Sequence, residues 1–464
     1  MNNRILSAGL LCIIFPLSTR SNTTEKPKDS APNIVFLLAD DCTYWDIGCY
    51  GSSDAITPNI DKLAAEGMKF TKFYQAAPMC SPTRHNLYTG IYPVRTGAYP
   101  NHTFVYPGTK TIIDYLEPLG YRVALSGKRH IAPEEIFRFE YLGNGNNLDF
   151  RKVDNFISNA SNNNEPFCLF LCSNEPHSPW NLGNPEKYNP DSIILPPFMV
   201  DTKETRKDFI RYLAEIEYLD SQVGEALDLL ARHGAVNNTV FIFSSEQGNS
   251  FPFAKWTCYD AGLHTAFIVK YPAVVKPGAI SEVLADYTDV VPTLIDIAGG
   301  NIPKYIDGKS LLPILKGKPF KHKKYSFGLQ TSRGIHSGPE QFAIRSVRDG
   351  KHSLIINLNH DKIFTNNITE RENEFWLSWK KEALTDSFAK QQVTAYQHRP
   401  PVELFDISAD PFNMNNLADD PRYSKTRKKL QWALEKWMDY CGDNGIETEI
   451  KAKERSWNLF NQSL

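Results

Sequence analysis

Residues 33–41, with the sequence NIVFLLADD, decide the fold. Residues 33–38 form an apolar run without the polar–apolar alternation of a half-exposed strand, so they predict a strand buried on both faces of a sheet. Four later runs have the same character, at residues 122–125, 167–171, 239–243 and 266–269. Together these runs predict one large, buried sheet.

Helical patterns separate the apolar runs. They cover residues 59–66, 111–119, 207–232 and 288–298. Strands that alternate with helices predict an α/β fold with a mainly parallel sheet sandwiched by helices.

The chain has 464 residues, which exceeds the size at which a single hydrophobic core stops growing. We therefore expect a large catalytic domain over residues 32–325 and a smaller domain over residues 326–464. Residues 307–318 have the pattern of a short amphipathic segment that runs into a basic linker. Beyond it, the sequence predicts short strands without intervening crossover helices, then a terminal helix, at residues 342–347, 352–357, 403–406 and 424–440. The second domain is predicted to be a small antiparallel sheet plus a helix.

The first 21 residues have the pattern of a signal peptide. Arg4 supplies a positive charge, residues 5–17 are mostly apolar, and small polar residues follow. This run is too short to span a bilayer as a helix, and no later run reaches transmembrane length. A buried N-terminal helix is the alternative, but the polar stretch that follows would separate such a helix from the rest of the fold. We expect export, with residues 22–31 as a linker: to the periplasm or medium in a bacterium, or to the lysosome in a eukaryote.

Charge and cysteine content exclude other classes of protein. The formal net charge is −2 and no basic block is present, so nothing indicates a nucleic-acid or anionic-membrane partner. Of eight cysteines, Cys12 lies in the predicted signal peptide. The remaining seven are sparse and odd in number, which does not describe a disulfide framework.

Charged and imidazole side chains follow four of the predicted strands. Because ligands of open α/β sheets bind beyond the carboxyl ends of the strands, we expect these side chains to meet at one edge. They are Asp40 and Asp41, Lys128 and His130, His177, and Glu246 with Gln247.

Consecutive acids at a strand end repel each other unless a cation lies between them. Asp40, Asp41, Glu246 and Gln247 offer only oxygen ligands, which favours a hard cation such as calcium or magnesium. An Asp-Asp pair after a strand is also typical of helix caps and solvated turns. The Glu246–Gln247 pair strengthens the metal interpretation.

Residues 80–90, CSPTRHNLYTG, carry the sharpest motif. They resemble the Cys/Ser-x-Pro-x-Arg signature of the type I sulfatase family, which belongs to the alkaline-phosphatase superfamily. The resemblance extends over nearly the whole exported chain. It includes the opening NIVFLLADD, the Gly-Lys-x-His segment at 127–130, Pro-His-x-Pro at 176–179 and the closing stretch at 403–417. An alkaline-phosphatase-like sulfatase fold is expected on this basis.

The resemblance implies that a maturation enzyme oxidises Cys80 to formylglycine, whose hydrate is a geminal diol. One diol oxygen attacks sulfur and displaces the alcohol or amine; the other hydroxyl then expels sulfate as the aldehyde re-forms. One calcium ion, held by Asp40, Asp41, Glu246, Gln247 and residue 80, is implied to activate the diol and neutralise charge.

The resemblance also assigns roles to the cations and histidines. Arg84 braces the diol and the metal ligands, while Lys128, Lys255 and His130 contact sulfate oxygens. Either His177 or His130 protonates the leaving group. The plainer alternatives are a structural thiol at Cys80, a loop histidine at 177 and a solvated lysine at 255.

Within the family, the chain looks most like the N-sulfoglucosamine sulfohydrolases, or heparan sulfamidases. Pro133-Glu134 follows the Gly-Lys-x-His segment as in that branch. Three features depart from it. Glu246-Gln247 replaces Asp-Asn, Lys255 replaces arginine, and residues 330–333 (QTSR) stand where adjacent histidines are expected.

The favoured substrate is therefore the N-sulfate of glucosamine in heparan sulfate or heparin fragments. An O-sulfate on glucosamine, galactosamine or fucose is the second hypothesis. A phosphonate or phosphodiester hydrolase on the same fold is the third, and a non-catalytic glycan-binding relative is the fourth. Only the altered Glu246–Gln247 pair favours the last.

Overall fold

The computed structural model describes residues 31–143, 145–371 and 373–456, which belong to one compact unit. The predicted signal peptide lies outside the described residues. No helix among the described residues is long and apolar enough to cross a membrane. The predicted boundary between residues 325 and 326 stays a prediction.

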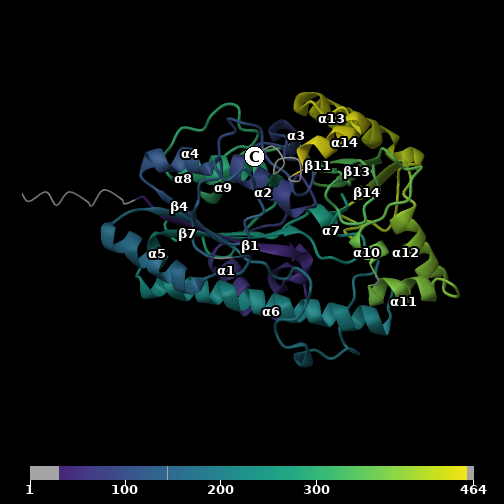
Figure 1. The fold of residues 1–464 in the computed structure, drawn as a ribbon, viewed down its shortest axis with the longest axis horizontal. Coiled ribbons are helices and arrows are strands. Elements are labelled where there is room, and N and C mark those ends of the chain that lie inside the picture. The colour runs from purple at the N-terminus through teal and green to yellow at the C-terminus, as the bar shows by residue number, and fades with distance from the viewer. Residues whose placement is uncertain (1–30, 144, 372, 457–464) are drawn as a thin grey trace, which may run out of the picture. The chain divides into compact units, whose positions relative to one another are not determined.

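An eight-stranded sheet forms the centre of the fold (Figure 1). Its strands, in spatial order, are β5 (Glu140–Tyr141), β4 (Arg122–Gly127), β6 (Phe167–Cys172), β1 (Asn33–Cys42), β7 (Thr239–Gln247), β8 (Phe267–Lys270), β2 (Met68–Phe70) and β9 (Ala279–Ser281). The first five strands run parallel, and β8 is antiparallel to both of its neighbours. The prediction of a mainly parallel sheet is confirmed.

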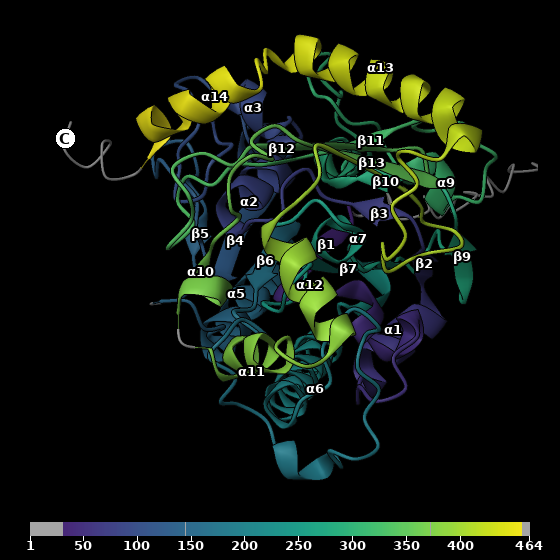
Figure 2. The same cartoon turned by 90° about the vertical axis from the view of Figure 1, so that its right-hand side faces the viewer.

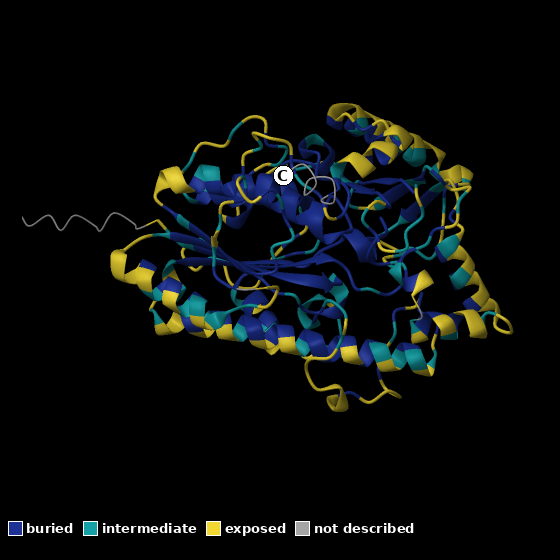
Figure 3. Cartoon of the chain, viewed as in Figure 1, coloured by how far each residue is buried: buried dark blue, intermediate teal, exposed yellow. Residues whose placement is uncertain are grey.

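Strand β1 is buried on both faces, as its apolar run predicts. Val35, Leu37 and Ala39 belong to the core on one face of the sheet. Ile34 and Phe36 belong to the core on the other. Successive side chains of a strand point to opposite faces, so an unbroken apolar run supplies both cores at once. Figure 3 shows the sheet as a buried layer between helices whose outer faces are exposed.

Helices cover both faces of the large sheet (Figure 1). One face carries α1 (Pro58–Glu66), α5 (Phe150–Asn163) and α6 (Lys203–Arg232). The other carries α2 (Cys80–Thr89), α4 (Ile112–Leu116), α8 (Val290–Ile297) and α9 (Leu312–Leu315). Three short helices complete this part: α3 (Pro93–Thr96), α7 (Asp260–Leu263) and, near the end of the chain, α14 (Ile446–Lys451). A separate two-stranded sheet consists of β3 (Phe73–Tyr74) and β10 (Ala285–Asp286).

A four-stranded antiparallel sheet follows in the chain, as predicted. Its order is β11 (Ser326–Gln330), β12 (Ile344–Arg348), β13 (His352–Asn357) and β14 (Val402–Asp406). Helix α13 (Ser424–Cys441) packs on it; Trp437 of this helix stacks on Phe327 at 5.0 Å between ring centroids.

Three helices that the sequence did not predict lie between β13 and β14, which are antiparallel neighbours, so none of the three is a crossover helix. Helices α10 (Asn367–Glu370), α11 (Glu374–Glu382) and α12 (Ser387–Gln397) lie in that connection. Figure 2 shows α11 beside α6. Trp379 is fully buried there, and its indole nitrogen donates to Thr205 Oγ1 at 2.8 Å. This excursion therefore packs onto the large sheet's helical layer rather than crossing the small sheet.

Candidate active site

The structure brings all ten predicted site residues to one edge of the large sheet. Strands β4, β6, β1 and β7 are parallel neighbours, so their carboxyl ends meet there. A cavity of about 630 Å³ opens at this edge. Five of the predicted residues line it: Cys80, Lys128, His130, His177 and Lys255. The other five, Asp40, Asp41, Arg84, Glu246 and Gln247, are fully buried.

Cys80 is the first residue of α2, every residue of which is buried. Its sulfur lies 3.6 Å from Asp40 Oδ1 and 3.9 Å from Lys128 Nζ. Burial, followed by the nearby Asp40 carboxylate, raises the pKa of the thiol to about 12. In this state residue 80 is a neutral thiol that faces a cavity rather than packed hydrocarbon.

Gln247 connects the predicted metal ligands. Its Nε2 lies 2.7 Å from Asp40 Oδ1, 2.8 Å from Asp41 Oδ1, 2.9 Å from Cys80 Sγ and 3.4 Å from Glu246 Oε1. One electropositive atom therefore touches all four other members of the predicted set. The amide group occupies the centre of an acidic cluster.

The donor set fits a hard divalent cation. Within the described residues, Gln247 Oε1 and Glu246 Oε2 are buried and have no hydrogen-bond partner. Buried polar atoms are seldom left unpaired. Turning the Gln247 amide over would aim its oxygen at the two aspartates, an arrangement that only a cation between them would favour. Asp40, Cys80 and His177 also offer ligand atoms within 4.8 Å of one another.

Arg84 makes hydrogen bonds that fix the position of this cluster. It lies one helical turn after Cys80, and its Nε and Nη2 donate to Glu246 Oε1 at 3.0 and 2.7 Å. Its Nη1 donates to the carbonyl oxygen of Lys128 at 2.6 Å. The planar guanidinium thus fixes Glu246 and the end of β4 with one rigid fork.

Two lysines pair with the two aspartates. Lys255 Nζ lies 2.7 Å from Asp41 Oδ2, and Lys128 Nζ pairs with Asp40. Burial alone would raise the pKa of Asp40, but Lys128, His177 and Arg84 together hold it well below its usual value. The alternative for Lys255 was a solvated lysine, but the structure buries this side chain in the cluster.

The two predicted histidines have different hydrogen-bond neighbours. His177 Nε2 is 3.6 Å from Asp41 Oδ2, and its Nδ1 is 2.6 Å from the carbonyl oxygen of Ser178. His130 Nε2 is 2.9 Å from Nδ1 of His102, a residue that sequence reasoning missed. Burial lowers the pKa of both His130 and His177, so both are neutral near pH 7 in this state.

Strained backbone positions concentrate at the site. Asp41, Gln247 and His130 have φ values of 62°, 44° and 49°. Such left-handed conformations are uncommon for residues other than glycine and gather at functional sites. Gly127 precedes Lys128 at φ 88°, where a Cβ would lie 2.1 Å from the carbonyl oxygen of Cys172. Only glycine lets β4 turn Lys128 into the cavity.

Several residues that line the cavity were not anticipated. They are Asn101, His102, Asn146, Ser178, Ser250, Trp256, Gly334, Ile335, His336, Asn367 and Arg371. One signal pointed towards His336: the loop at 330–333, noted for lacking adjacent histidines, ends three residues before it. Ser178 is the variable position of the Pro-His-x-Pro segment, and the others match no motif.

Comparison with solved structures defines the class of fold. A protein solved in complex with its substrate D-glucosamine-2-N,6-O-disulfate aligns with a TM-score of 0.69 and 20% identity, over 89% of this chain and 99% of that chain. The likeness establishes the alkaline-phosphatase-like fold that the sequence predicted.

The particular family follows from the sequence comparisons. The sulfatase family model matches residues 32–300, and the model for the C-terminal part of N-sulphoglucosamine sulphohydrolase matches residues 248–364. An ulvan-active sulfatase of Formosa agariphila is 35% identical over 422 residues, covering 89% of this chain and 81% of that protein. Human N-sulphoglucosamine sulphohydrolase is 26% identical, covering 88% and 89%. The chain belongs to the sulfatase family and is an enzyme that hydrolyses sulfate esters or sulfamates.

Proposed function

We propose that this enzyme removes sulfate from a sulfated glycan, preferentially the N-sulfate of glucosamine in heparan sulfate or heparin fragments. The observation that carries the proposal is the position of Cys80. It opens α2 at the base of a polar cavity, beside two lysines and above a cluster of buried acids. A residue in that position can attack a bound anion that the lysines hold.

Two groups complete the proposed site. Oxidation of Cys80 to formylglycine supplies a hydrated aldehyde as nucleophile, and a calcium ion held by Asp40, Asp41, Glu246, Gln247 and residue 80 supplies Lewis-acid stabilisation. The formal charge of the site without calcium is zero, because its three carboxylates are matched by the cations of Arg84, Lys128 and Lys255. A divalent cation would make the site positive and suited to a sulfate group.

The side chains around residue 80 have distinct proposed tasks. Lys128 and Lys255 bind the oxygens of the anionic sulfate group, while the charge that develops as the bond breaks falls on the leaving oxygen or nitrogen. Arg84 keeps Glu246 and the Lys128 backbone in place through its three hydrogen bonds. His177 and His130 both line the cavity, and one of them, after taking up a proton in the substrate complex, protonates the leaving alcohol or amine.

The substrate proposal is supported by the C-terminal family match over residues 248–364 and by the human sulphohydrolase relative. A second candidate, an O-sulfated glycan, is favoured by the 35% identity to an ulvan-active sulfatase. Lys255 also departs from the sulfamidase branch, because a point charge replaces the planar fork of arginine beside the bound sulfate. We retain export through the N-terminal segment and maturation by a formylglycine-forming enzyme as parts of the proposal.

The decisive experiment joins mass analysis to turnover. Protein produced with a formylglycine-forming enzyme should contain a peptide at position 80 whose thiol is replaced by an aldehyde oxygen, and should release sulfate from N-sulfated disaccharides. Cys80→Ala should lower turnover by at least about 10⁴-fold, because the covalent route is lost. Cys49→Ala, which removes a half-buried cysteine away from the cavity, is the matched control.

A panel of defined disaccharides separates the two substrate classes. Turnover of an O-sulfated disaccharide without any release from its N-sulfated counterpart would reverse the order of the candidates. An aldehyde at position 80 with no sulfate release from any sulfated glycan would refute the proposed substrate class. Sulfate and phosphate esters of one leaving group, assayed in parallel, test the phosphohydrolase alternative.

A further inference from the structure

A second cavity adjoins the active-site cavity. Its volume is about 650 Å³, within the range of about 300–1,000 Å³ typical of ligand sites. Five residues line both cavities: Ser178, Ser250, Trp256, Asn367 and Arg371. Because the same side chains bound both spaces, a ligand in the first cavity can extend into the second.

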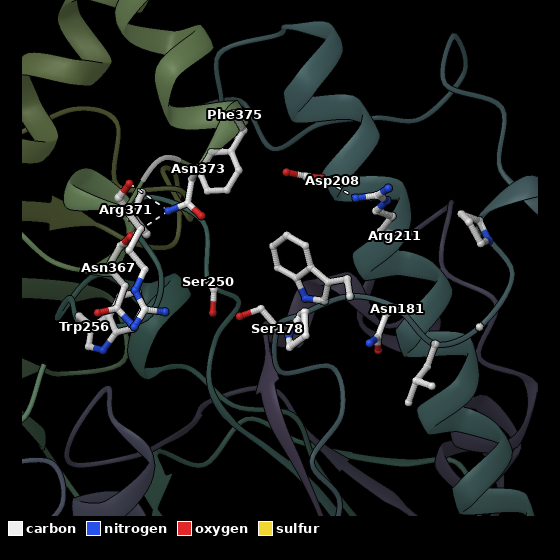
Figure 4. Close-up of a pocket in the computed structure, with 16 residues that line it drawn as sticks. Ser178, Asn181, Asp208, Arg211, Ser250, Trp256, Asn367, Arg371, Asn373 and Phe375 are labelled. Atoms are coloured by element: carbon white, nitrogen blue, oxygen red, sulfur yellow. Dashed lines mark hydrogen bonds and ion pairs between the residues drawn. The ribbon is translucent and has the colours of Figure 1, made fainter. Parts of the chain in front are cut away.

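The second cavity has two facing walls (Figure 4). Asp208 and Arg211 project from α6 on one side, and Asn367 and Arg371 lie on the other. Ser178 and Ser250 lie between them. The two walls come from segments more than 150 residues apart in sequence, which the packing of α11 against α6 holds together.

The cavity is cationic. Its charged lining residues are Asp208, Arg211 and Arg371, which gives a formal charge of 2 − 1 = +1. Arg211 pairs with Asp208 at 3.6 Å, yet 47% of its side chain stays exposed. Arg371 is exposed, and its guanidinium has no ion pair or hydrogen bond within the part of the chain that the structure describes. An arginine without an acid partner at a cavity wall is suited to an anionic ligand.

The rest of the lining suits a sugar ring. Asn181, Asn367 and Asn373 provide amide donors and acceptors, and Asn367 Oδ1 is buried without a hydrogen-bond partner among the described residues. Trp180, fixed by stacking on Phe251 at 4.9 Å, adds an apolar surface. A few convergent polar groups beside aromatic surface are typical of small-ligand sites.

We propose that this second cavity binds the anionic sugar next to the sulfate-bearing sugar of the same glycan, with Arg211 and Arg371 holding its carboxylate or sulfate group. The inference rests on the proposed function, and it makes the substrate an oligosaccharide rather than a monosaccharide. Binding energy from the neighbouring sugar lowers KM for oligosaccharides relative to a monosaccharide.

Arg211→Ala tests this assignment, because Arg211 lines the second cavity and not the first. The substrates are glucosamine N-sulfate and a heparin-derived tetrasaccharide, with an ulvan-derived tetrasaccharide as a separate arm. For whichever tetrasaccharide the parent enzyme hydrolyses, the variant should increase KM about tenfold more than it increases KM for the monosaccharide. This difference is expected for the loss of one charge-assisted hydrogen bond. Arg211→Lys should recover part of the loss.

Arg232→Ala is the matched control. Arg232 lies on the same helix with 59% of its side chain exposed, and it is absent from both cavity linings. Its removal subtracts the same charge and should leave KM unchanged for every substrate. Equal effects of Arg211→Ala on the monosaccharide and the tetrasaccharides would overturn the assignment, as would no effect on either.

A binding measurement keeps the test separate from turnover. The Cys80→Ala protein should bind at least one of the two tetrasaccharides in calorimetry, and adding Arg211→Ala should weaken that binding about tenfold. Affinities that agree within about twofold, or no binding of either tetrasaccharide, would refute the second site. If the Cys80→Ala protein binds as expected but the mature parent enzyme releases no sulfate, the proposed reaction is refuted and the second site is not.

Discussion

Arg84 shows how one side chain supports both stability and chemistry. It is fully buried and makes two hydrogen bonds to Glu246 and one to the Lys128 carbonyl. We expect Arg84→Ala to destabilise the protein by about 3–5 kcal/mol, because it leaves the Glu246 carboxylate buried without its partner. Denaturant unfolding measures this loss.

A double variant separates charge from packing at this position. Arg84→Ala with Glu246→Gln should recover part of the lost stability, since the uncompensated carboxylate is gone. A loss below about 1 kcal/mol for the single variant would contradict the role given to the ion pair.

At the residue scale, the sequence predicted the residues at the strand ends better than those at the rim of the cavity. Asp40 and Gln247 lie at the carboxyl ends of buried strands and His177 follows another, so the sheet alone fixes where they meet. His102 and Arg371 reach the cavity from irregular segments. Their positions depend on the packing of distant segments, which leaves no periodic signal in the sequence.

Among the elements, α6 contains a buried acid that makes stability depend on pH. Glu215 accepts from the backbone nitrogens of Asn181 and Leu182 at 3.1 Å each. Burial, and then the charge of Glu175, raises the pKa of Glu215 to about 8. Between about pH 4.3 and pH 8 the folded state keeps a proton that the unfolded state has lost, so stability falls as pH rises.

Glu215→Gln should remove this dependence. The variant and the parent protein should be similar in stability near pH 4, and the variant should become the more stable of the two as pH rises to 8. Unfolding free energies measured across that range test the prediction. Glu225→Gln, an exposed change on the same helix, should leave the dependence of the unfolding free energy on pH unaltered. The same dependence in Glu215→Gln as in the parent protein would contradict the role given to Glu215.

Strands were predicted more completely than helices. The five long buried runs all became strands because continuous burial requires continuous apolar sequence. Helix α5 was missed, although Val153, Phe156, Ile157 and Ala160 form a buried stripe at helical spacing. The short strands β2 and β9 have only three residues each, too few for a pattern.

At the scale of the whole molecule, the proposed calcium site joins separate parts of the chain. Its ligands come from β1, α2 and β7. A cation that binds only the folded state stabilises it, by about 2.7 kcal/mol at a free concentration one hundred times Kd. Removing calcium with a chelator should lower Tm by a few degrees and abolish sulfate release, and calcium addition should restore both.

Asp41→Asn is the control for that experiment. It removes one ligand charge from the cluster, so the Tm of the variant should respond less to calcium than that of the parent protein. An identical Tm of the parent protein in chelator and in excess calcium would argue against a resident cation.

Two parts of the chain line the active-site cavity. The groups nearest Cys80 come from residues before 260, whereas His336, Asn367 and Arg371 belong to the small sheet's connections. Part of the proposed sugar contact is thus encoded in a later stretch of the gene than the reactive groups. Substitutions in the later stretch can therefore change which polysaccharide the enzyme accepts without changing the residues next to Cys80.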